Sequence, residues 1–197
     1  MIAFALVGVV ALTAAACSSS DEDAGGESTT TAAAEETTTT EAPETLTILV
    51  GNDDGVGAPG IAALVEALAA MPDTEVIVSA PLEQQSGTGG KTTEGELVVT
   101  DATTERGYEA KAVAGFPADA INWALDGGIE VTPDLVVTGI NSGQNLGSIG
   151  DQVSGTIGAA RAAVAHGVPA LAASASAGEG VDYDLAAQNA ALAEARA

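Results

Sequence analysis

Residues 46–60 of the chain read Leu-Thr-Ile-Leu-Val-Gly-Asn-Asp-Asp-Gly-Val-Gly-Ala-Pro-Gly. The first five residues are apolar or β-branched and give way to glycine and polar residues, which predicts a buried strand over 46–50. Pro59 suits a first helical turn, and apolar residues recur at helical spacing up to Met71, which predicts a helix over 59–71. A strand followed directly by a helix is the repeating unit of α/β proteins.

The same alternation continues along the rest of the chain. Further strands are expected over 75–79, 96–100, 109–114, 134–138 and 168–174, and further helices over 119–125, 156–165 and 183–196. Residues 82–95 are polar and rich in Gly, Ser and Thr, which predicts a long loop of the kind that often carries function. We therefore expect a three-layer α/β fold that is Rossmann-like, with a mostly parallel sheet between two layers of helices (αβα).

The first 45 residues differ in kind from the domain expected over 46–197. Residues 1–16 form an apolar, small-residue run that suits a signal peptide and is short for a membrane span of roughly 20 residues. The three alanines before Cys17 resemble a bacterial lipoprotein cleavage site, which implies a lipid on the Cys17 sulfur. The remainder of 17–45 is rich in Thr and Glu without apolar periodicity, which predicts a disordered tether.

These features predict an exported lipoprotein, held to a membrane by its lipid on the cell surface or the periplasmic side. An ordinary signal peptide, giving a secreted protein, and an uncleaved anchor are the alternatives. Cys17 is the only cysteine and His166 the only histidine, which excludes an intrachain disulfide, a cysteine-based zinc cluster and a three-histidine zinc site.

The chain is strongly acidic, with 28 Asp and Glu against five Lys and Arg and a net charge of −23. Such a surface repels long nucleic acids, because their binding depends on basic grooves that neutralise phosphates. A small phosphorylated substrate would need a cation to neutralise the local field. The acidity therefore favours a metal, although a solubilising surface on an exported protein is an equal explanation.

Three polar clusters follow directly after predicted strands, at 52–55, 84–87 and 139–143. In α/β sheets, ligands bind beyond the carboxyl ends of the strands, so these clusters are expected to meet. Asp53 and Asp54 are neighbouring carboxylates that a bound cation would stabilise, although Asp-Asp-Gly is also ordinary turn chemistry. With neutral oxygens from Ser86 and Asn141, they would suit a hard ion such as Mg²⁺ or Mn²⁺.

The stretch 139–158 is rich in glycine, and its last part, Ser154-Gly155-Thr156, comes just before a predicted helix. Backbone N–H groups at a helix N-terminus, together with hydroxyl groups, make an anion site suited to phosphate. The stretch matches neither the P-loop nor the dinucleotide-binding pattern. A haloacid-dehalogenase phosphatase needs Asp-x-Asp after its first strand, and Asp53-Asp54-Gly55 lacks that spacing.

Six motifs in order resemble the SurE (survival protein E) nucleotidase family, from residue 46 to about residue 190. The first is Ile48-Leu-Val-Gly-Asn-Asp-Asp-Gly-Val-Gly-Ala-Pro-Gly-Ile61, and the others are 81–87, Gly115-Phe-Pro-Ala-Asp119, Pro133-Asp-Leu-Val-Val-Thr-Gly-Ile-Asn-Ser-Gly143, Asn145-Leu-Gly147 and Ser154-Gly-Thr-Ile-Gly-Ala-Ala160. The resemblance implies a metal-dependent phosphomonoesterase that acts on nucleoside 5′- or 3′-monophosphates. It also implies homodimers or tetramers of the full-length protein, and a chain that is cut short at its C-terminus.

The resemblance carries over to particular residues of this sequence. The implied ligands of one divalent ion, Mg²⁺ or Mn²⁺, are Asp53, Asp54, Ser86 and Asn141. The implied phosphate pocket is lined by Asn52, Gly87, Asn145, Ser154, Gly155 and Thr156. Asp53 or Asp54 would be the base for the attacking water, and the residues leave open which of the two acts.

Some positions depart from the family pattern, and a second function class stays open. Phe116 stands where the family more often has Thr, Ala120 replaces a frequent Cys, and Val153 replaces an aromatic residue; these changes touch pocket walls rather than the metal set. His166 is interpreted as a helix-end dipole partner. The alternative to an enzyme of nucleotides or other phosphomonoesters is a non-catalytic or degenerate metal- or phosphate-binding lipoprotein.

Overall fold

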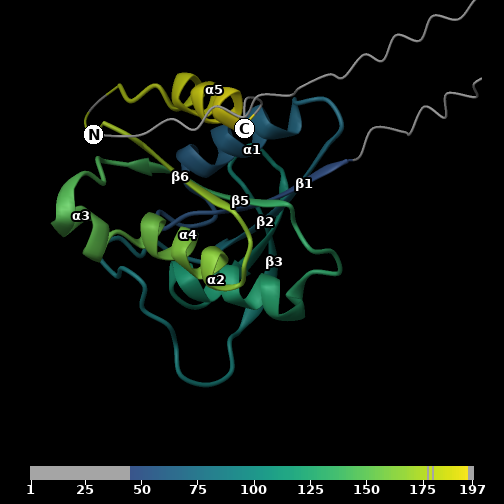
Figure 1. Cartoon of the computed structure of the whole chain (residues 1–197), viewed down its shortest axis with the longest axis vertical. Coiled ribbons are helices and arrows are strands. Elements are labelled where there is room, and N and C mark those ends of the chain that lie inside the picture. The colour runs from purple at the N-terminus through teal and green to yellow at the C-terminus, as the bar shows by residue number, and fades with distance from the viewer. Residues whose placement is uncertain (1–44, 177, 179, 195–197) are drawn as a thin grey trace, which may run out of the picture. The chain divides into compact units, whose positions relative to one another are not determined.

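The structure, a computed structural model, describes residues 45–176, 178 and 180–194. The expected signal peptide, Cys17 and all but the last residue of the tether lie outside these residues. Figure 1 shows a sheet with helices on both of its faces. Within the described ranges, no helix combines the length and apolar character needed to cross a bilayer.

Over the described part of the chain, the sheet has six strands in the order β3-β4-β2-β1-β5-β6, and all neighbours are parallel except β3 and β4. Their bounds are β1 Leu46–Gly51, β2 Thr74–Pro81, β3 Val99–Thr103, β4 Glu109–Val113, β5 Leu135–Ser142 and β6 Ala170–Ala175. The chain builds outward from β1 through β2 and then crosses to β5 on the other side of β1. The strand order therefore reverses between β1 and β5, which is where α/β sheets bind their ligands.

Helices cover both faces of the sheet, and the three-layer α/β fold predicted from the sequence is confirmed (Figure 1). Their bounds are α1 Pro59–Ala69, α2 Pro117–Trp123, the π-turn η1 Ala124–Gly128, α3 Gly147–Val153, α4 Gly155–Ala165 and α5 Tyr183–Glu194. The core has two parts: one lies between the sheet and α1 and α5, and the other between the sheet and α2 and α4.

The central strand shows why its sequence is a continuous apolar run. Ile48 and Val50 pack in the layer of α1, whereas Leu49 packs in the layer of α2 and α4, and all three are fully buried. A strand covered on both faces has no solvent side, so the alternation of polar and apolar residues disappears. This burial fixes the position of the residues that follow β1.

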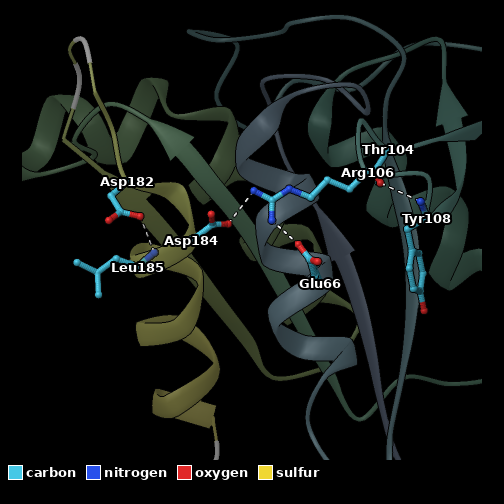
Figure 2. Close-up of polar contacts among 7 residues, drawn as sticks. All are labelled: Glu66, Thr104, Arg106, Tyr108, Asp182, Asp184 and Leu185. Atoms are coloured by element: carbon cyan, nitrogen blue, oxygen red, sulfur yellow. Dashed lines mark hydrogen bonds and ion pairs between the residues drawn. The ribbon is translucent and has the colours of Figure 1, made fainter.

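Polar contacts on the outer side of α1 connect it to α5 and to the turn between β3 and β4 (Figure 2). Arg106, in that turn, forms ion pairs with Glu66 of α1 and with Asp184 of α5, the latter at 2.7 Å between Nη2 and Oδ1. Asp182 accepts the N–H of Leu185 at 2.9 Å and so caps the first turn of α5. The ion pairs are exposed, so apolar burial accounts for most of the docking of α5.

Several element boundaries differ from those expected, most clearly those of β3, α2 and β5, and one stretch without an expected element contains a helix. The strand expected over 96–100 is β3, Val99–Thr103, because its antiparallel register with β4 selects the paired residues. The helix expected from 119 begins at Pro117, because the Asp119 carboxylate accepts the N–H of Phe116 at 2.8 Å. β5 continues to Ser142 beside β6, and the glycine-rich stretch includes the helix α3.

Candidate active site

The carboxyl ends of β1, β2 and β5 and the N-terminus of α4 meet at one edge of the sheet. The Gln85 N–H, in the loop after β2, donates to the Asp53 carbonyl at 2.7 Å. The Ser142 N–H, at the end of β5, donates to Asp54 Oδ2 at 3.0 Å. The Thr156 hydroxyl, in the first turn of α4, donates to Asp53 Oδ1 at 2.6 Å. Three segments that are distant in sequence therefore contact Asp53 and Asp54, two of them through the carboxylates and one through the Asp53 carbonyl.

Asp53 is a buried carboxylate, with 3% of its surface exposed. Burial raises its pKa above the ordinary value; the hydrogen bond from Thr156 opposes this shift, and the negative charge of Asp54 adds to it. The charged form of Asp53 is therefore costly in the folded chain without a positive partner. A cation at this edge of the sheet would remove that cost.

Two asparagines flank the two carboxylates: Asn52 precedes Asp53 in sequence, and Asn141 precedes Ser142, whose N–H donates to Asp54. Asn141 is buried, and its Nδ2 donates to the Gly143 carbonyl at 2.7 Å, which leaves its Oδ1 as an acceptor. Asn52 is also buried, and its Nδ2 donates to the Gly55 carbonyl at 2.8 Å. Among the described residues, no donor reaches Asn52 Oδ1. A buried acceptor of this kind suits a cation or a water, because a phosphate oxygen would need a donor.

The donor set fits a hard divalent ion. The described residues contain no group of three or more His, Cys, Asp or Glu placed to hold a metal. A cation here would rely instead on the carboxylates of Asp53 and Asp54, neutral amide oxygens and water, which is the ligand chemistry of Mg²⁺ and Mn²⁺. The raised pKa of Asp53 and the unpaired oxygen of Asn52 both agree with this set.

Ser86 and Gly87 lie on the exposed part of the loop after β2. The Ser86 hydroxyl accepts from Gln84 Nε2 at 2.5 Å, and Gly87 has a φ of 81°, which favours glycine. The same loop is held near α4 by the Gly89 N–H, which donates to the Val153 carbonyl at 2.9 Å. The structure therefore brings the loop to the site but turns the Ser86 hydroxyl toward Gln84.

The N-terminus of α4 offers hydrogen-bond donors of the kind that bind anions. Ser154 is the N-cap, and its Oγ accepts the N–H of Ile157 at 3.1 Å, so its hydroxyl proton can still be donated to a ligand. Asn145 Nδ2 donates to Ser174 Oγ at 2.9 Å and lies 3.4 Å from Thr156 Oγ1. The first N–H groups of a helix have no partner within the helix, so residues 154–156 are suited to phosphate oxygens.

Two residues of this edge were not among the candidates from the sequence. The fully buried Thr138 donates its hydroxyl to the Thr156 carbonyl at 2.9 Å and fixes α4 to β5. Ser174 holds Asn145 from the end of β6. Thr138 and Ser174 stand at the ends of the predicted strands 134–138 and 168–174, and no motif in the sequence marks either as part of a site. His166 lies at the C-terminal end of α4, with Nε2 3.1 Å from Asn122 Oδ1, away from the site.

The fold and this edge of the sheet define an α/β protein with an acidic, cation-compatible site that faces a helix N-terminus. The sequence model of the family described as "Survival protein SurE" matches residues 48–196. The chain therefore belongs to the SurE family, and the resemblance seen in its motifs is confirmed.

Curated relatives carry the name 5′-nucleotidase SurE. The protein from Desulfitobacterium hafniense is 44% identical over 146 residues, which cover 74% of this chain and 57% of the relative. The protein from Methanothermobacter thermautotrophicus is 42% identical over 154 residues, covering 73% and 58%. The crystal structure of the SurE protein from Aquifex aeolicus aligns with a TM-score of 0.65 at 34% identity, covering 76% of this chain and 59% of that one. The chain thus spans less than two thirds of the length of these relatives.

Proposed function

We propose that the protein is a phosphomonoesterase that uses one divalent ion, Mg²⁺ or Mn²⁺, to remove phosphate from nucleoside 5′- or 3′-monophosphates. The observation that carries the proposal is the Asp53–Asp54 pair opposite the N-terminus of α4. Relatives at 42–44% identity that are named 5′-nucleotidases support it and argue against a merely binding lipoprotein. The proposal includes a homodimer or tetramer of the full-length protein, which light scattering on that protein tests.

The residues that would hold the ion are Asp53, Asp54, Asn141 and Ser86. When bound, a divalent ion supplies positive charge to the transferring phosphoryl group and lowers the pKa of a water nucleophile. Ser86 would first have to exchange its hydrogen bond with Gln84 for a place in this set. Because the loop that carries it is exposed, that exchange needs only a local adjustment.

The chain's own groups would bind and orient the phosphate. The backbone N–H groups of Gly155 and Thr156 and the Ser154 hydroxyl would donate to its oxygens, and these donors are fixed before the substrate arrives. Asn145 would support Thr156, and Gly87 would line another side of the phosphate. Asn52 Oδ1, which no donor among the described residues reaches, would face the ion or a water rather than the phosphate. The Thr156 hydroxyl holds one oxygen of Asp53, so the carboxylate keeps its direction while Asp53 or Asp54 takes the proton of the water.

Phosphate release from 5′-AMP and 3′-AMP tests this function on the full chain. We expect release with Mg²⁺ or Mn²⁺ and its loss, on the order of 10²-fold or more, after chelation with EDTA, because the carboxylates alone repel the substrate. Adding back the ion should restore the rate, which controls for unfolding by the chelator. Undiminished release in EDTA would contradict the metal, and nucleotide binding without any turnover would favour the non-catalytic alternative.

We further propose that the protein is exported and held at a membrane through a lipid on Cys17. The support is the apolar run 1–16 that ends in three alanines directly before this cysteine. In a bacterial host, Cys17→Ser should move the protein from the membrane fraction to the soluble fraction, because a thioether-linked lipid cannot form on serine. If the variant stays with the membrane, an uncleaved anchor is the better explanation.

A further inference from the structure

A cavity of about 360 Å³ lies between the loop after β2 and the turn that joins β4 to α2. Leu82, Gln85 and Thr93 line it from the loop, and Gly115 and Phe116 line it from the turn. Neither the phosphate side nor the carboxylate side of the site uses these side chains. The volume falls in the range of small-molecule sites, which are concave and mostly apolar with a few placed polar groups.

The cavity adjoins the candidate active site through both of its walls. On the side of the loop after β2, the Gln85 N–H donates to the Asp53 carbonyl at 2.7 Å, so this wall of the cavity lies next to the carboxylate pair. Phe116 directly precedes Pro117, whose Cγ lies 2.9 Å from the position of a Cβ added at Gly155. The wall formed by the turn between β4 and α2 therefore lies next to the N-terminus of α4, where the phosphate is proposed to bind. Gln85 itself lines the cavity and contacts Asp53, and Phe116 is the sequence neighbour of Pro117, which approaches Gly155. A group esterified to a phosphate at this site therefore has the cavity beside it.

One buried carboxylate ties the two walls together. Asp119, with 3% of its surface exposed, accepts the Thr93 N–H at 3.0 Å and the Thr93 hydroxyl at 2.7 Å. It also accepts the Phe116 N–H at 2.8 Å. The width of the cavity is therefore set before any ligand enters. A preformed cavity binds with a smaller loss of conformational entropy than one that must order its loop.

The lining favours a neutral, flat group over a second anion. Among the described residues that line it, Glu83 is the only charged one and none is Lys or Arg, so an additional phosphate would be repelled. Phe116 is half-buried and Leu82 is half-exposed, so both offer apolar surface beside the polar groups of Gln85 and Thr93. A nucleobase has the matching character, because its faces are apolar and its edges form hydrogen bonds.

We propose that this cavity binds the nucleoside of the substrate and that Phe116 is the surface on which the base stacks. This inference rests on the proposed function and adds to it a residue that determines specificity. Stacking of a base on an aromatic side chain strengthens binding by roughly tenfold or more.

The test compares Phe116→Leu, which keeps an apolar side chain without the ring, with Phe116→Tyr, which keeps the ring. For 5′-AMP, Phe116→Leu should raise KM roughly tenfold with little change in kcat, and Phe116→Tyr should behave like the wild type. Glycerol 2-phosphate has no base, so its KM should stay the same in both variants. An equal loss on both substrates, or an unchanged KM for 5′-AMP in Phe116→Leu, overturns the proposal.

Calorimetric titration keeps this inference separate from the function on which it rests. If the wild-type chain hydrolyses neither substrate, the proposed function fails, and binding of 5′-AMP and glycerol 2-phosphate in the presence of Mg²⁺ then decides the role of the cavity. A roughly tenfold weaker affinity of Phe116→Leu for 5′-AMP alone supports it. Equal affinities of wild type and Phe116→Leu for 5′-AMP, or no binding by the wild type, overturn it.

Discussion

Asp53→Asn is expected to reduce phosphate release on the order of 10²- to 10³-fold or more and to leave the domain folded. The change removes one negative charge from the candidate metal set, whereas the amide oxygen can still accept the Thr156 hydroxyl that Asp53 Oδ1 accepts at 2.6 Å. Activity should therefore be lost without loss of the contact that joins β1 to α4. Phosphate release and circular dichroism on the same samples check both parts.

The same variant should be as stable as the wild type, or more stable, when no metal is present. Burial raises the pKa of Asp53, so the folded state binds its proton more tightly than the unfolded state. As pH rises from the pKa that Asp53 has in the unfolded chain through its raised pKa in the folded chain, the folded wild type loses stability, because it must give up this proton. Asparagine has no such proton, so the variant does not lose this stability. Thermal unfolding in EDTA, measured as pH is raised from about 4, should show a smaller decline for Asp53→Asn.

Asp73→Asn is the matched control, because Asp73 is exposed and lies in a turn with a φ of 51°, which asparagine tolerates. It makes the same change of charge and should keep both activity and stability. Added Mg²⁺ or Mn²⁺ should raise the melting temperature of the wild type and of this control but not of Asp53→Asn. Wild-type turnover in Asp53→Asn would remove the carboxylate from the proposed mechanism, and loss of cooperative unfolding would make it a structural residue.

The parts that the sequence predicted well are those whose signals are local. The apolar run of β1, the helical spacing of α1 and the carboxylates directly after β1 are read within a few neighbouring residues. The α/β alternation then places the carboxyl ends of the parallel strands on one edge of the sheet, so the meeting of the clusters 52–55, 84–87 and 139–143 followed from topology alone. The signal for the start of α4 is also local, because Ser154 is a favourable N-cap residue and small residues follow it.

The parts that it missed depend on contacts between distant segments. The hydroxyl of Thr156 and the carboxylate of Asp53 are 103 positions apart, and Thr93 and Asp119 are 26 positions apart. No local pattern shows that Asp119 is a buried tether between a loop and a helix. The start of β3 was likewise set by its register with β4 rather than by its own residues. For the same reason, the direction of the Ser86 hydroxyl could not be read from its place in the loop.

Gly155→Ala is expected to destabilise the domain by roughly 1–3 kcal/mol and to lower kcat on the order of 10²-fold. A Cβ at this position would lie 2.6 Å from Asp53 Cβ and 2.9 Å from Pro117 Cγ, both far inside van der Waals contact. The φ of Gly155 is not in the left-handed region, so the cost is steric rather than conformational. Either Asp53 or the first turn of α4 must move, and both sides of the candidate site depend on their separation.

Gly90→Ala is the control, because a Cβ added there meets nothing within 4 Å and the residue lies in the loop beside the same site. Urea unfolding and steady-state rates on the two variants should show a large change for Gly155→Ala and little for Gly90→Ala. A loss of stability in Gly155→Ala with normal kcat would mean that the shift falls on Pro117 and spares the carboxylate. Normal stability together with normal kcat would contradict the close approach of α4 to β1, because the structure leaves no space for a methyl group between them.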